Sequence, residues 1–234
     1  MASPYVINLD SRPDRWTSIN RDWKGVFPLT RVTAVTASPG WIGCGLSHVK
    51  AVEEAKTRGD PYVLVWEDDC SPLNHTPTQV RDLWNEVLYK LSLNKDQWDI
   101  VTGGTTNVEK GSTLNEGLST RNVNVYDLPF GFTTHWILYN SSAYDKMIEW
   151  KHVQAPQIDV YIYQQFRIKI VTPFMAAQAS GYSNIQGGIL NYNDLFMKAE
   201  RMFRRSSTFG SKTSLAAIVQ SPLSRVATPK FMTR

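Results

Sequence analysis

The sequence predicts an α/β/α sandwich with a mostly parallel, mixed sheet of the Rossmann-like nucleotide-binding kind. Short apolar runs alternate along the chain with longer segments in which apolar residues recur at helical spacing. This alternation is typical of strands joined by crossover helices. The 234 residues, 42% of them hydrophobic, are enough for one domain with a large core. A disordered chain is therefore excluded, and the two cysteines cannot form a disulfide framework.

The first half of the chain predicts three strands and two helices. Tyr5 to Leu9 is an apolar run that ends in polar residues, and Pro13 suits the first turn of a following helix. β-branched residues predict the second strand, and Gly59 is well placed to end the second helix. The continuous apolar run before Glu67 predicts a central strand covered on both faces. The expected elements are a strand at 5–9, a helix at 11–23, a strand at 30–35, a glycine-rich loop at 40–45, a helix at 46–58 and a strand at 62–66.

The second half continues the pattern as far as about Ser183, after which it fades. An amphipathic repeat predicts a long helix, and the polar, glycine-containing segment 105–122 predicts a surface loop or a hairpin over the functional site. The other expectations follow from apolar runs and helical periodicity in the same way. They are a helix at 78–93, strands at 99–102, 130–139 and 168–171, and helices at 141–150 and 158–167.

Charge divides the chain into two unequal parts. Residues 1–200 hold 18 Lys and Arg against all 21 acids, a net −3, whereas residues 201–234 hold seven Lys and Arg and no acid, a net +7. We expect a domain at 1–200 and a basic, Ser/Thr-rich tail at 201–234 that is flexible or docked. The net charge of +4 therefore does not indicate a nucleic-acid partner, although the tail could contact an anionic membrane peripherally. With no signal peptide and no long apolar span, a soluble cytoplasmic protein is expected.

Three consecutive carboxylates, Glu67, Asp68 and Asp69, follow the central strand directly. Adjacent carboxylates in partial burial repel one another unless solvent or a cation neutralises them. Mg²⁺ or Mn²⁺ prefers such oxygen ligands and shares its coordination shell with substrate phosphates. The pattern alone leaves two interpretations open, a metal site or an acidic turn after a strand.

Two further motifs accompany the acidic cluster. Tyr5-Val6-Ile7-Asn8-Leu9-Asp10 leads into Ser11-Arg12-Pro13-Asp14-Arg15, and Gly43-Cys44-Gly45-Leu46-Ser47-His48 leads into a helix. In this order the three segments resemble glycosyltransferase family 25, the lipopolysaccharide and procollagen galactosyltransferase type. The similarity covers roughly residues 4 to 188 and is weaker after the acidic cluster. It implies a GT-A type fold, a nucleotide-sugar donor and a Mn²⁺ or Mg²⁺ cofactor.

The resemblance assigns roles to residues of all three motifs. It places Asp69 on the metal, with Glu67 as a further candidate ligand, and Glu67 or Asp68 on the ribose or a metal-bound water. Asn8 and Asp10 would lie near the base or ribose, at the strand ends where α/β sheets bind nucleotides. Arg12 and Arg15 suit phosphate, but each could equally belong to a solvated helix start.

Three polar residues near these motifs have competing interpretations. Ser47 is assigned to the donor site, yet a helix N-cap alone would explain it. His48 could hydrogen-bond to the sugar donor or to the acceptor substrate, or it could stabilise the acidic loop. We expect it to lie near the site. His135 is a minor metal candidate and is more typical of a packed histidine.

Family 25 enzymes invert the anomeric centre, which requires a general base. Asp159 matches the family's aspartate in its segment and is the candidate base, with a helix N-cap as the alternative. The sequence departs from the family at Asn184, where an aspartate is usual. Asn184 could ligate a metal only through its neutral amide oxygen, and Gln178 could line the same side of the site.

The sequence therefore predicts a metal-dependent glycosyltransferase that moves a sugar from a nucleotide-sugar to a glycan, glycolipid or glycoprotein. A UDP-sugar is the first candidate for the donor. A binding module of the same fold with weakened catalysis, and a nucleotidyltransferase, are the alternatives. No phosphate-binding loop of the kinase type and no dinucleotide fingerprint occurs in the chain.

Overall fold

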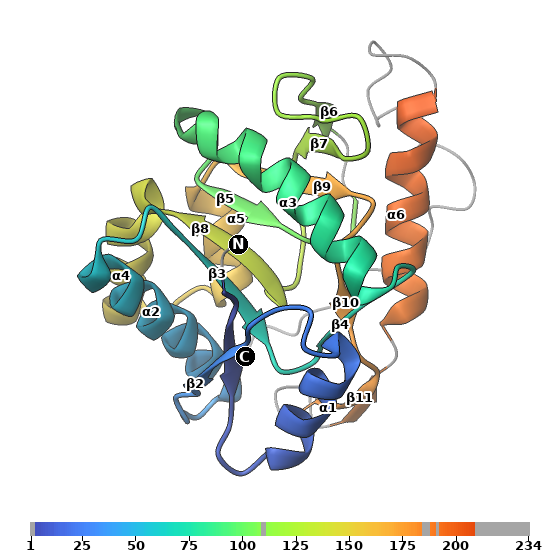
Figure 1. The fold of residues 1–234 in the computed structure, drawn as a ribbon. Helices are drawn as coiled ribbons and strands as arrows, with labels where there is room; N and C mark the ends of the chain where they lie inside the picture. The colour runs from blue at the N-terminus through green and yellow to red at the C-terminus, as the bar shows by residue number, and fades with distance from the viewer. Residues whose placement is uncertain (1–2, 109–110, 184–187, 191, 209–234) are drawn as a thin grey trace.

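The computed structural model describes residues 3–108, 111–183, 188–190 and 192–208, and one eight-stranded sheet forms its centre (Figure 1). The strands are β1 (Tyr5–Asn8), β2 (Thr30–Thr33), β3 (Tyr62–Glu67), β5 (Ile100–Thr102), β6 (Thr113–Leu114), β7 (Asn124–Asp127), β8 (Trp136–Asn140) and β9 (Ile168–Thr172). Their order across the sheet is β2-β1-β3-β8-β5-β9-β7-β6. β7 and β8 run antiparallel to their neighbours, so the other six strands share one direction. The predicted α/β class with a mostly parallel, mixed sheet is confirmed.

Helices cover both faces of this sheet. Those on one face are α1 (Pro13–Trp23) and α3 (Pro77–Leu93), and those on the other are α2 (Gly40–Arg58), α4 (Tyr144–Val153), α5 (Ile158–Gln165) and α6 (Asn193–Thr208). Short elements complete the fold: β4 (Cys70–Ser71) pairs with β10 (Ala177–Gln178), β11 (Gly181–Ser183) pairs with β12 (Gly188–Leu190), and two 3-10 turns span Lys95–Gln97 and Ser141–Ala143. The side chains of β3 alternate between the two cores, as expected for a central strand.

Tryptophan rings fix the end of β3 on the α1 face. The Trp66 ring centroid lies 4.6 Å from that of Trp23 and 4.3 Å from that of Trp136, and all three rings are fully buried. Trp23 Nε1 also donates a hydrogen bond of 2.9 Å to the carbonyl oxygen of Cys70. This packing holds the C-terminal end of α1 beside the residues that follow β3.

The glycine-rich segment 40–45 is helical, so its prediction as a loop is wrong. α2 begins at Gly40 and continues to Arg58. A Cβ atom at Gly43 would lie 2.5 Å from the carbonyl oxygen of Val35, and one at Gly45 would lie 2.2 Å from the Trp150 ring. These glycines permit close packing of a helix and do not mark a flexible turn.

Several boundaries also differ from the expectations. The predicted strand at 130–139 begins at Trp136. In the segment 105–122, predicted as a surface loop or a hairpin over the site, β6 pairs with β7, which follows that segment, and the pair lies at the sheet edge opposite β2. α6 crosses the expected boundary at residue 200 and packs Phe196 and Phe203 into the core. The remaining tail, residues 209–234, lies outside the described residues. No helix in the described part of the chain is long and apolar enough to cross a membrane.

Candidate functional site

The first and third motifs meet where β1 and β3 end. The two strands are parallel neighbours with Ile7 opposite Glu67, so Asn8 lies beside Asp68. The Asn8 side-chain amide donates to Asp68 Oδ2 at 2.8 Å and to the carbonyl oxygen of Arg12 at 3.0 Å. Asn8 is buried, with 1% of its surface exposed. The structure therefore brings the first motif and the acidic cluster together at the carboxyl edge of the sheet, as the sequence predicts.

Asp68 is neutralised by the protein itself. Arg15 Nη1 lies 2.7 Å from Asp68 Oδ1 and 3.7 Å from Asp69 Oδ2. The Asp68 side chain is 10% exposed and that of Arg15 22%, so water screens this ion pair only in part. Arg15 thus reaches both aspartates from the first turns of α1.

Arg12 and Asp10 lie farther from the acidic cluster. Arg12 Nη2 forms an ion pair of 2.7 Å with Asp14, and hydrogen bonding to Arg12 lowers the pKa of Asp14 to about 2. Asp10 is mostly exposed and pairs with Arg31 at 2.8 Å. Arg31 in turn donates to Asn8 Oδ1, so Asp10 is linked to the site through two other side chains.

Asp69 is the carboxylate whose charge is least compensated. Its Oδ1 atom is buried and has no hydrogen-bond partner among the described residues. Burial raises its pKa to about 8, and the negative charges of Glu67 and Asp68 add to this effect. The carbonyl oxygen of Asp69 accepts a hydrogen bond of 2.6 Å from the Ala179 amide, which fixes the backbone here. A buried carboxylate oxygen with no partner and two acidic neighbours fits the binding of a hard divalent cation.

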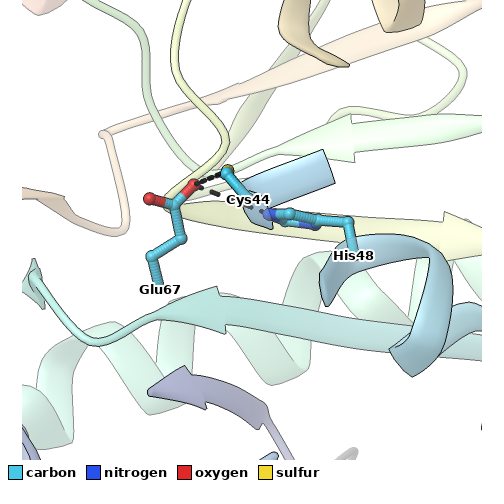
Figure 2. A group of neighbouring side chains, drawn as sticks. All are labelled: Cys44, His48 and Glu67. Carbon is cyan, nitrogen blue, oxygen red and sulfur yellow. Dashed lines mark hydrogen bonds and ion pairs between the residues drawn. The ribbon is translucent and has the colours of Figure 1, made fainter. Parts of the chain in front are cut away.

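Glu67 points toward Cys44 and His48 of α2 (Figure 2). Its Oε1 atom accepts a hydrogen bond from Thr134 Oγ1 and lies 3.9 Å from Cys44 Sγ and 3.5 Å from His48 Nε2. Burial alone would raise the pKa of Glu67, but His48 and Thr134 together lower the pKa below its ordinary value. Glu67 is therefore held as a carboxylate by its neighbours on α2 and before β8.

Ser47 is an internal residue of α2, so the expectation of a helix N-cap is wrong. Pro39 is the N-cap residue. Ser47 is fully buried, donates to the carbonyl oxygen of Gly43 at 2.6 Å and accepts from the Val35 amide at 2.8 Å. Its hydroxyl thereby joins α2 to the segment after β2.

Asp159 lies in the first turn of α5, on the same side of the sheet as Glu67. The N-cap position belongs to Gln157, and the Asp159 carboxylate accepts the Val160 amide at 2.8 Å. Burial raises the pKa of Asp159, and the negative charge of Glu67 raises it further. A carboxyl group with a raised pKa is suited to accept a proton near neutral pH.

The three remaining candidate site residues are His135, Gln178 and Asn184, and they lie in different places. His135 is buried, its two ring nitrogens lie 3.1 Å from Thr133 Oγ1 and from the Ala176 carbonyl oxygen, and burial lowers its pKa to about 4. It is a packed, hydrogen-bonded histidine. Gln178 pairs with Cys70 in the β4–β10 ladder, directly beside the acidic cluster. Asn184 lies outside the described residues.

Sequence reasoning missed Cys44, Thr134 and Tyr139. Cys44 and His48 are four residues apart, a spacing that places both on one face of a helix, but the loop prediction for 40–45 concealed it. Thr134 precedes β8 and Tyr139 lies within it, and no local sequence motif identifies either residue.

No protein-family model matches the chain, and no curated protein matches it. Among solved structures the chain is similar to A197 from STIV, with a TM-score of 0.42 and 10% identity over 81% of this chain and 93% of that one. It is also similar to mannose-1-phosphate geranyltransferase from Thermus thermophilus (TM-score 0.38, 11% identity, 71% and 58% covered). A third similar structure is apo-UDP-glucose pyrophosphorylase (TM-score 0.38, 11% identity, 88% and 82% covered). At these scores the likeness carries no argument about activity.

Proposed function

We propose that the protein is a metal-dependent glycosyltransferase. It would move a sugar, with inversion, from a nucleotide-sugar, UDP-linked in the first instance, to a hydroxyl of a glycan, glycolipid or glycoprotein. The single observation that carries this proposal is the buried, unpartnered Oδ1 of Asp69 at the carboxyl edge of the sheet, beside Glu67 and Asp68; no partner for it lies in the described part of the chain. That edge is where α/β sheets bind nucleotides.

Asp69 is the residue that would hold Mn²⁺ or Mg²⁺. A bound divalent ion acts as a Lewis acid and offsets the charge that develops on a departing diphosphate. Asp68 is already paired with Arg15 and Asn8, so its role in the proposal is to position that arginine and that amide. Arg15, which reaches both aspartates, lies where it can also meet a phosphate oxygen.

Asp159 is proposed as the general base for the acceptor hydroxyl. Its raised pKa and its place on the Glu67 side of the sheet support this role. On this proposal the Asp159 carboxylate accepts the hydroxyl proton as the oxygen attacks the anomeric carbon, and the nucleoside diphosphate leaves from the opposite face.

The test is release of free nucleoside diphosphate from a panel of UDP- and GDP-sugars, with Mn²⁺, with Mg²⁺ and with a chelator. We expect metal-dependent release from at least one donor, a loss of about a hundredfold or more in Asp69→Asn, and no loss in Asp82→Asn. Asp82 is the matched control because it is an exposed aspartate that pairs with Arg81. A donor that binds but is neither hydrolysed nor transferred would refute the transferase proposal and support the alternative, a nucleotide-sugar-binding or glycan-binding module.

A further inference from the structure

Three potential metal ligands of different chemical type converge on the α2 side of β3. Cys44 and His48 project from α2, one helical turn apart, toward Glu67 at the end of β3 (Figure 2). One ligand atom from each residue lies within 4.8 Å of the others. Both of the chain's cysteines and all four of its histidines lie within the described ranges, and in those ranges this is the cluster with metal-ligand spacing.

His48 provides independent evidence for a cation site among these three side chains. Its side chain is fully buried, and its Nε2 atom makes no hydrogen bond within the described part of the chain. The other ring nitrogen, Nδ1, lies 2.9 Å from the Tyr139 hydroxyl. In the tautomer whose Nδ1–H donates to Tyr139, Nε2 presents a lone pair to Glu67 Oε1, and a cation between the two atoms would satisfy both. In the other tautomer, Nε2–H faces Oε1 across 3.5 Å without forming a hydrogen bond.

The spacing favours a metal ion over a proton. A charge-assisted N–H···O bond measures about 2.7–2.9 Å, whereas Nε2 and Oε1 are 3.5 Å apart. Around a tetrahedral Zn²⁺, ordinary bond lengths place nitrogen and oxygen ligands roughly 3.3 Å apart and sulfur and oxygen ligands roughly 3.5 Å apart. The 3.5 Å and 3.9 Å separations of His48 and Cys44 from Glu67 are within a few tenths of an ångström of these values.

We propose that Cys44, His48 and Glu67 form a second metal site, for a thiophilic divalent ion such as Zn²⁺. Thiolate and imidazole ligands select such an ion over Mg²⁺. The ion displaces the Cys44 thiol proton to solvent, and the thiolate and carboxylate then balance its two charges, so no net charge is buried. Tyr139 and Thr134, hydrogen-bonded to His48 and Glu67, orient two of the three ligands. The site is independent of the proposed transferase activity.

The experiment is a titration of the metal-free, full-length protein with Zn²⁺ and with Co²⁺. We expect one Zn²⁺ per chain in the presence of excess Mg²⁺, and with Co²⁺ an absorption band from thiolate-to-metal charge transfer. Cys44→Ser should abolish the band, and His48→Gln should weaken Zn²⁺ binding by about a hundredfold or more, because even an outer hydrogen-bonding partner is worth roughly 10- to 100-fold. Asp69→Asn should leave the band unchanged, which separates this site from the one at Asp69.

Cys70→Ser is the matched control, since Cys70 is buried in the core on the opposite face of the sheet. It should keep both the band and the stoichiometry. In the wild-type protein, Zn²⁺ but not Mg²⁺ should protect Cys44 from alkylation, read by peptide mass, whether or not a variant folds. Absence of Zn²⁺ uptake and of protection in the wild type, or an unchanged Co²⁺ band in folded Cys44→Ser, would overturn the proposal.

Discussion

Asp68 and Asp69 are neighbours in the chain but differ in how the protein treats their charge. Asp68 has Arg15 at 2.7 Å and the Asn8 amide at 2.8 Å, and it belongs to a completed network between α1 and β1. Asp69 has Arg15 no nearer than 3.7 Å and leaves a buried oxygen without a partner among the residues that the structure describes. The difference indicates that Asp68 serves mainly to hold the site together, whereas Asp69 is available for a ligand from outside the chain.

The largest predicted effect concerns a third carboxylate, Asp159. Asp159→Asn should lower turnover by about 10²- to 10⁴-fold, the usual contribution of a general base, and leave the affinity for the nucleotide-sugar almost unchanged. Steady-state kinetics with an identified acceptor measure both quantities. An equal loss in donor affinity would place Asp159 in the donor site and remove it as the base.

The next largest effect is a difference in stability between the Asp68→Asn and Asp69→Asn variants. Asp68→Asn should lower the free energy of unfolding by about 2 kcal/mol, because Arg15 loses its nearest charge in a half-buried position. Asp69→Asn should be close to neutral at neutral pH, where the folded carboxyl group already carries a proton, and stabilising above about pH 8, where it relieves repulsion from Glu67 and Asp68. Denaturant unfolding of both variants, with Asp82→Asn as control, measures this. If Asp69→Asn proves the more destabilising, the assignment of roles is reversed.

A smaller effect is the pH dependence of stability in metal-free protein. Burial and the charges of Glu67 and Asp68, opposed by Arg15, raise the folded-state pKa of Asp69 to about 8. An unfolded aspartate has a pKa of about 4. Between these values the folded state retains a proton that the unfolded state releases, so stability falls as the pH rises from about 4 to about 8. The fall should be on the order of 1 kcal/mol or more, and Asp69→Asn should reduce it. An identical slope in both proteins would contradict the raised pKa.

The smallest effect tests Ser47. Ser47→Ala should cost about 1 kcal/mol of stability, because the half-buried Val35 amide loses its acceptor, and it should not change the donor KM. Thermal unfolding and donor kinetics check the two halves of this prediction. A large rise in KM would return Ser47 to the donor site.

The fold was largely predictable because its signals are local. Apolar runs marked β1, β3 and β9, and amphipathic periodicity with Pro13 and Gly59 marked the helices. The start of α2 was not predictable in this way, since Gly45 packs against the ring of Trp150, which is distant in sequence. β7 is a short strand that was not predicted, and its pairing with β9 identifies it as part of the sheet.

The residues of the candidate site were largely predictable from the sequence, but the contacts between them were less so. The acidic cluster and Asn8 were recognisable as polar residues at strand ends, and the structure joins them. The sequence could not show that Arg15 pairs with Asp68 while Arg12 turns to Asp14, because that choice depends on how α1 leaves β1. It also could not show that Glu67 turns toward α2, because alternation along a strand places Glu67 on one face of the sheet without telling which helix covers that face.

The most direct test of the central claim is Mn²⁺ binding in the presence of a nucleoside diphosphate, measured by calorimetry on the wild type, Asp69→Asn and Asp68→Asn. The account predicts that Asp69→Asn loses Mn²⁺ affinity by about a hundredfold or more, and that folded Asp68→Asn loses about tenfold or less. Equal affinity in the wild type and Asp69→Asn would contradict it.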